Sequence, residues 1–206
     1  MSQEQTAFPM FHLHFGLGQQ NECESASLYL PANHQQIKKA LDSIDSCCLA
    51  ECVCHSLSGR IGQVADGYRD MSQFNRLNLL AFQAVELEKQ GLFPKYEAMI
   101  EATDCVDIED AIELVGQVDE YFLEPQTLTP ADVAREELDV ILCDKDAEFI
   151  TCSLDLEDYG ARLMQRDNMR LTSQGLLMRA DHESIPDLGP PGPEQEQDTT
   201  EYQQTM

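Results

Sequence analysis

The sequence has few basic residues. It contains 13 Lys and Arg against 38 Asp and Glu in 206 residues, so its formal net charge is −25 and its pI is about 4.2. Proteins that neutralise nucleic-acid phosphates carry a basic patch and an elevated pI, so this composition argues against direct binding to DNA or RNA. Self-repulsion on this scale opposes compaction, and a globular chain tolerates it for solubility in high salt or for a cationic partner.

Long apolar runs and a secretory leader are also missing. The apolar runs are too short to span a bilayer, and the first residues, Met1–Gln5, lack the basic and apolar regions of a signal peptide. We therefore expect a cytoplasmic protein without membrane contact. The hydrophobic fraction is nevertheless 42%, with eight Phe and six Tyr, which is enough to build folded cores.

Motifs for catalysis are absent as well. The chain has no Gly-rich phosphate loop, no HExxH, no nucleophile elbow and no EF-hand spacing. Neighbouring carboxylates such as Glu136 and Glu137, or Asp155, Glu157 and Asp158, have the chemistry for acid–base catalysis or for a divalent cation. Acids this abundant form such pairs by chance, so we expect no enzyme and no cofactor.

Two groups of possible metal ligands stand out, and neither has a finger-like spacing. Cys47, Cys48, Cys52 and Cys54 cluster before His55 without a CxxC pair. His12 and His14 share one face of a predicted strand without a third ligand nearby. The favoured interpretation is free thiols that act as small buried hydrophobes, with the histidines partly exposed, and no metal; a zinc site is the alternative.

Hydrophobic periodicity predicts an α+β fold, with elements that change character along the chain. Alternating apolar residues predict strands at 11–15, 27–30, 49–56, 121–123 and 171–179. Helices are predicted after the capping residues Asn33, Ser72, Asp107 and Thr129, after Pro94 in the first turn of another, and around 156–163. The helix after Thr129 should extend to about Leu142.

These elements suggest about three small domains in an elongated chain. We expect an α/β domain at 8–58, a mainly helical domain at 59–123 and an acidic α/β domain at 124–185. Residues 186–206, which begin with Pro186, lack apolar periodicity and are rich in Pro, Gln and Glu. We expect them to form a disordered tail.

The negative charge is concentrated in one stretch. Residues 97–158 hold 20 acidic residues and only two basic ones, Arg135 and Lys145, a net charge of −18. The acids alternate with an apolar stripe, so helices there should turn the stripe inward and the carboxylates outward. The candidate partner-binding carboxylates are Asp104, Asp107, Glu109, Asp110, Glu113, Asp119, Glu120, Asp132, Glu136, Glu137 and Asp139.

A solvated acidic face that serves solubility is the simpler explanation of this pattern. The near absence of Lys and Arg over 62 residues argues against it, because pairs at i,i+4 stabilise a helix. Duplex DNA carries one charge per roughly 1.7 Å of its axis, so 25 charges match about 40 Å of duplex. A rigid surface of this kind would be steered electrostatically into a basic groove, and salt would weaken the binding.

Several short motifs follow one another along the chain: Leu30-Pro31-Ala32 before a helix ending at Ile44, the sequence LNLLA at 77–81, the acidic stretch 108–121, and Tyr159-Gly160 with 173–177 after it. In this order they resemble the Firmicute-type ArdA antirestriction proteins. The resemblance covers roughly residues 10 to 180. The Cys-rich first domain, the tail and the lack of a clean acidic antirestriction motif depart from the family pattern.

The resemblance implies a curved rod of three small domains, usually a homodimer, that imitates bent B-form DNA. Such proteins are encoded on conjugative elements and phages, and they occupy the DNA-binding groove of type I restriction-modification enzymes. The resulting hypothesis is a DNA-mimic inhibitor. Two alternatives would show the same charge pattern and are not excluded by it. One is an inhibitor of another DNA-binding defence protein such as a CRISPR effector, and the other is an acidic adaptor for a basic protein.

Overall fold

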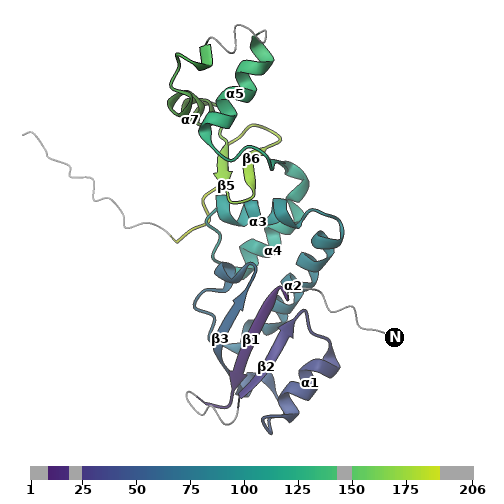
Figure 1. Ribbon diagram of the computed structural model, residues 1–206. Coiled ribbons are helices and arrows are strands. Elements are labelled where there is room, and N and C mark those ends of the chain that lie inside the picture. Colours follow the sequence, from purple (N-terminus) through teal and green to yellow (C-terminus); the bar gives the residue numbers. More distant parts are fainter. Residues whose placement is uncertain (1–8, 19–24, 143–149, 191–206) are drawn as a thin grey trace, which may run out of the picture.

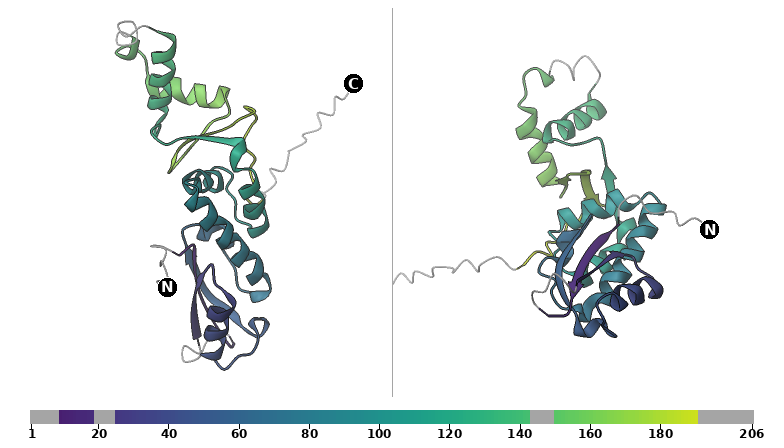
Figure 2. Two further views of the ribbon diagram at one scale, coloured as in Figure 1. Left: turned by 90° about the vertical axis from the view of Figure 1, so that its right-hand side faces the viewer. Right: turned by 60° about the horizontal axis from the view of Figure 1, so that its bottom comes forward.

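The computed structural model describes residues 9–18, 25–142 and 150–190 (Figure 1). Within these ranges the chain forms six α-helices and two three-stranded antiparallel sheets. The predicted α+β class is confirmed. In Figures 1 and 2, the first sheet lies towards one end, the helices between residues 74 and 116 lie in the middle, and the two helices between residues 130 and 166 lie at the other end.

The first sheet contains β1 (Phe11–Gly16), β2 (Ser25–Leu30) and β3 (Val53–Gly59) in the order β2-β1-β3. Alternation along β1 places Phe11, Leu13 and Phe15 in the core. Helix α1 (His34–Asp42) begins after Asn33, whose side chain accepts hydrogen bonds from two backbone N–H groups of the first turn. This cap is the predicted one.

The third predicted strand is wrong in its first half. Leu49–Glu51 form a 3-10 turn, and β3 starts only at Val53. The backbone hydrogen bonds close locally here, because the N–H groups of Glu51 and Cys52 donate to the carbonyls of Cys48 and Leu49. Alternating hydrophobicity alone does not distinguish this turn from a strand.

The middle of the chain is helical, as predicted, with α2 (Phe74–Lys89), α3 (Phe93–Ala102) and α4 (Ile108–Gly116). Short 3-10 turns precede and follow these helices, at Gly62–Ala65, Met71–Gln73 and Val118–Glu120. The predicted cap Ser72 is wrong. Ser72 lies inside a 3-10 turn, where its N–H and O–H both donate to the Asp70 carboxylate at 2.8 Å, so Asp70 caps the approach to α2.

One continuous core connects the first sheet with the helices. Its buried side chains run from Met10 through Leu77 and Tyr96 to Tyr121, with Leu177 and Ile185 joining from the end of the described chain. The boundary predicted between residues 58 and 59 falls inside this core. The division into three domains stays a prediction.

The second sheet contains β4 (Tyr121–Glu124), β5 (Arg170–Thr172) and β6 (Gly175–Arg179) in the order β4-β6-β5. The single strand predicted over 171–179 is a hairpin. Its turn needs glycine at position 175, where φ is +133° and a Cβ would lie 2.3 Å from the Glu124 carbonyl oxygen. The Thr172 hydroxyl donates to the Gly175 carbonyl at 2.8 Å and closes the turn.

Helices α5 (Pro130–Ile141) and α7 (Leu156–Arg166) pack against each other beside this sheet. The start of α5 is as predicted: Thr129 and Asp132 form a capping box, and Pro130 occupies the first turn. A Cβ on Gly160 would lie 1.7 Å from the Pro130 carbonyl oxygen, so glycine permits the close approach of α7 to α5.

The described part of the predicted tail lies against the body of the protein. The Leu188 N–H donates to the Thr103 carbonyl at 2.7 Å, and Ile185 just before it is buried. A structureless tail is therefore not confirmed over residues 186–190, and residues 191–206 lie outside the described part. Among the described residues, no helix has the length and apolar character needed to cross a membrane.

Candidate partner-binding surface

The eleven predicted carboxylates lie on three neighbouring stretches: α4 with its preceding loop, the 3-10 turn at Val118–Glu120, and α5. Eight of them are exposed, and Asp110, Asp132 and Glu137 are half-buried. The opposite faces are buried through Ala111 and Leu114 in α4, and through Ala134 and Leu138 in α5. Both helices therefore turn these buried residues inward and the acids outward, as predicted, whereas Val140 and Ile141 in the last turn of α5 are exposed.

Three of these carboxylates are fixed by local hydrogen bonds. Asp107 caps α4 and accepts from the Glu109 N–H at 2.7 Å. Asp132 accepts the Thr129 hydroxyl at 2.7 Å, and this hydrogen bond is the main reason that the Asp132 pKa lies below its ordinary value. Glu136 accepts the Thr127 hydroxyl at 2.6 Å. Such contacts hold the charges at defined positions on the helices.

Ion pairs engage few of the eleven. Glu109 meets Arg76 at 3.1 Å, Glu137 meets Arg166 at 3.5 Å, and Asp132 meets Arg135 at 2.9 Å. Exposed pairs of this kind contribute little to stability. Within residues 9–18, 25–142 and 150–190, the remaining carboxylates make no side-chain hydrogen bond or ion pair: Asp104, Asp110, Glu113, Asp119, Glu120 and Asp139.

The few basic side chains are already occupied within the protein. Of the twelve that the structure describes, seven contact carboxylates and three donate to backbone carbonyls. Lys38 and Lys39 on α1 are the two described exceptions. The structure also describes 28 of the 38 acidic residues, and nine of these form ion pairs. The excess negative charge therefore faces outward without an internal counter-charge.

Two acids of the same stretch have structural roles that the sequence reasoning missed. Glu101 accepts the N–H and O–H of Ser173 at 2.9 and 2.6 Å, which holds the β5–β6 turn on α3. Glu97 is half-buried beside Arg60 at 3.4 Å, and burial raises its pKa. Glu97 and Glu101 are four residues apart, which places both on one side of α3. This spacing is the sequence pattern from which their shared structural face could have been predicted.

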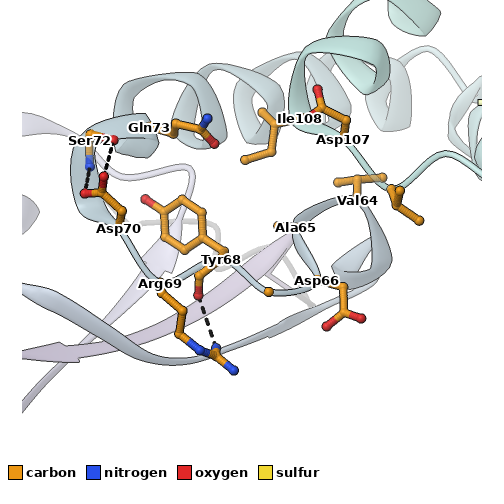
Figure 3. Close-up of a pocket in the computed structure, with 12 residues that line it drawn as sticks. Val64, Ala65, Asp66, Tyr68, Arg69, Asp70, Ser72, Gln73, Asp107 and Ile108 are labelled. Atoms are coloured by element: carbon orange, nitrogen blue, oxygen red, sulfur yellow. Dashed lines mark hydrogen bonds between the residues drawn. The ribbon is translucent and has the colours of Figure 1, made fainter. Parts of the chain in front are cut away.

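A pocket of about 310 Å³ lies beside the first turn of α4 (Figure 3). Tyr68 is one of the residues that line it, and the Asp70 carboxylate is turned towards Ser72. The hydrogen bond from the Ser72 backbone N–H is the largest cause of a lowered Asp70 pKa, and the Ser72 hydroxyl contributes as well. Neither His nor Cys is among the residues that line the pocket. Arg69 also lines the pocket, and the Tyr68 side chain is buried, so the pocket gives no separate indication of a ligand.

Metal-ligand groupings are missing from the described part of the chain. No set of three or more His, Cys, Asp or Glu side chains there has an arrangement that holds a metal ion. Cys52 and Cys54 are buried free thiols, as predicted, whereas Cys47 and Cys48 are exposed. His12 and His14 lie half-buried on the outer face of β1, with ring centroids 4.3 Å apart.

Comparison of the chain with protein-family models and with curated proteins finds no match. The likeness to ArdA-type proteins thus rests on the short motifs quoted above. Any function must therefore be inferred from the net charge, the placement of the carboxylates and their few ion pairs within the described residues.

Proposed function

We propose that the protein is a DNA mimic that inhibits a defence enzyme by occupying its DNA-binding groove. One observation carries the proposal: eight of the eleven carboxylates on α4, α5 and the adjoining loop and 3-10 turn have no ion-pair partner among the described residues. Each such carboxylate would take the place of a phosphate opposite a Lys or Arg of the enzyme. The type I restriction-modification enzymes are the first candidates, through the resemblance to ArdA-type proteins.

The spacing of the acids on the helices supports this role. Asp107, Asp110 and Glu113 on α4 follow one another every three residues, which is about 4.5 Å along a helix axis. Phosphates of one DNA strand follow every 3.4 Å or so along the duplex axis. A helix with such a face therefore offers charge at a density comparable with one strand of DNA.

The arrangement of the elements supports an extended footprint. The first sheet, the middle helices and the α5–α7 pair follow one another along the vertical direction of Figure 1. We infer an elongated, curved acidic rod that would lie lengthwise in the groove. A homodimer would double its length, as the ArdA resemblance implies.

The proposal predicts that neutralising the unpaired carboxylates abolishes inhibition. The test variant changes six of them to amides: Asp104, Asp110, Glu113, Asp119, Glu120 and Asp139. Six contacts of about 0.5 kcal/mol each correspond to about a 100-fold weaker competition with DNA for a type I restriction enzyme. The salt dependence of binding should become shallower in the same variant.

The matched control changes six exposed carboxylates outside the proposed surface to amides, with the same change in net charge: Asp42, Asp45, Glu51, Asp66, Glu183 and Asp187. Competition should weaken by less than about threefold in this control, because only long-range attraction is lost. Equal losses in both variants would mean that net charge, and not the placed carboxylates, governs binding. If the protein inhibits a CRISPR effector but not the restriction enzyme, the target is a different defence enzyme and the DNA-mimic mechanism is retained.

A further inference from the structure

The side of the second sheet that faces α5 and α7 has an incomplete core. In the described part of the chain, only Val133, Leu163 and Leu176 are fully buried in this cluster. Met169 and Met178 pack against them but stay half-exposed. A core this small leaves apolar surface uncovered at one end of the protein.

The uncovered surface continues onto β4 and α5. Phe122 pairs directly with Met178, and residues opposite each other in an antiparallel pair share one face of the sheet. Phe122 is 55% exposed, and Val140 on α5 is 83% exposed. Val140 lines a groove of about 230 Å³, together with the apolar residues Val133, Leu163, Met169, Leu176 and Met178. Phe122 lies on the same face of the sheet as Met178 but outside the groove lining. Contiguous exposed apolar surface of this kind marks an interaction site.

The rim of the groove is acidic. Glu124, Glu136, Glu137 and Asp167 stand around it with one base, Arg166. The Arg166 guanidinium is already bound to Asp167 at 2.6 Å and to Glu137 at 3.5 Å. The rim therefore presents net negative charge around an apolar floor.

We propose that this groove receives an apolar side chain of a basic protein segment, with flanking Lys or Arg residues on the acidic rim. Charge complementarity selects this occupant, because a second copy of the chain would bring one acidic rim against another. The two methionines of the groove can adapt to the shape of the inserted side chain. The inference rests on the proposed function only for the positive charge of the partner.

Such an anchor would give the protein a contact that a duplex does not supply. Carboxylates on α4 and α5 would steer the partner at long range, and this part of the affinity would fall with salt. Apolar contact in the groove would persist at high salt, because screening acts on charges and not on buried apolar surface. Binding at high salt therefore reports on the groove alone.

The test uses two labelled hexapeptides and the full chain. One peptide has two central leucines between two lysines at each end, and the other has serines in place of the leucines. At 0.5 M salt the dileucine peptide should bind about tenfold more tightly, a ratio equivalent to about 1.4 kcal/mol. The variant Val140→Ser should lose this preference.

Ile141→Ser is the matched control, since Ile141 is the next residue on α5, is 59% exposed and lies outside the groove lining. The control should keep the tenfold preference. Equal binding of the two peptides, or an unchanged preference in Val140→Ser, would overturn the proposal. The proposal would also be overturned if the wild-type protein forms a dimer that Val140→Ser dissociates, because the groove would then bind a second copy of the chain. The peptide-binding assay uses no restriction enzyme, so its failure can be distinguished from a failure of the proposed DNA mimicry in the competition experiment.

Discussion

At the scale of the residue, the carboxylates divide between holding local structure and presenting charge. Asp107 does both, because it caps α4 and belongs to the acidic surface. Glu101 holds structure through Ser173, and Glu97 lies half-buried beside Arg60. Asp104 and Asp139 have no described partner, and we assign them to the surface alone. The two kinds of role call for different substitutions.

At Asp107, two substitutions can separate the contribution of the helix-capping hydrogen bond from that of the negative charge. Asp107→Asn keeps the side-chain oxygen that accepts the Glu109 N–H, so the free energy of unfolding should change by less than about 0.5 kcal/mol. Asp107→Ala removes the acceptor and should destabilise the fold by about 1 kcal/mol. Urea unfolding of both variants measures these values. Equal destabilisation by Asn and Ala would show that the charge, and not the cap, stabilises α4.

Glu97 gives the pH dependence of stability a defined sign. Burial raises its pKa in the folded protein, so this residue favours folding at low pH and opposes it once the pH rises through the raised pKa. Glu97→Gln should therefore raise Tm at pH 7, and the gain should vanish at pH 4. Glu88→Gln is the control, because Glu88 contacts the same Arg60 guanidinium with 40% of its side chain exposed. A lower Tm for Glu97→Gln at pH 7 would mean that the contact with Arg60 outweighs burial.

At the scale of the element, local chemistry predicts helix starts better than strand ends. Asn33, Asp107 and Thr129 were recognisable as caps because their hydrogen bonds involve residues two or three positions away. The β5–β6 hairpin was not recognisable, because the constraint on Gly175 comes from the Glu124 carbonyl, some fifty residues earlier. Ser72 looked like a cap, but the neighbouring Asp70 carboxylate takes its N–H.

The packing of α7 on α5 depends on Gly160. A Cβ at this position would overlap the Pro130 carbonyl, so Gly160→Ala should push the two helices apart and destabilise the protein by about 1–3 kcal/mol. Gly116→Ala on α4 is a suitable control, since nothing lies within 4 Å of a Cβ there. Thermal unfolding compares the two. A neutral Gly160→Ala would show that α7 can shift on α5 without cost.

At the scale of the whole molecule, the net charge and its concentration in residues 97–158 were readable from the sequence. The outward orientation of the acids followed from helical periodicity in α4 and α5. Two features were not readable. Ion pairs between residues distant in sequence, such as Arg76 with Glu109 and Arg60 with Glu97, join separate elements, whereas pairs such as Lys89 with Glu86 and Arg135 with Asp132 are local. The continuous core across residue 58 likewise depends on contacts between distant elements.

The central claim is that this surface replaces DNA in a basic groove. The most direct measurement is competition by the wild-type protein against a DNA duplex for a purified type I restriction enzyme, at 50 and 200 mM salt. If the surface replaces DNA, the protein should displace DNA stoichiometrically at the lower salt. Because salt screens the attraction between the carboxylates and a basic groove, affinity for the protein should fall at the higher salt. Failure to displace DNA at either salt, with this enzyme and with a CRISPR effector alike, would contradict the account.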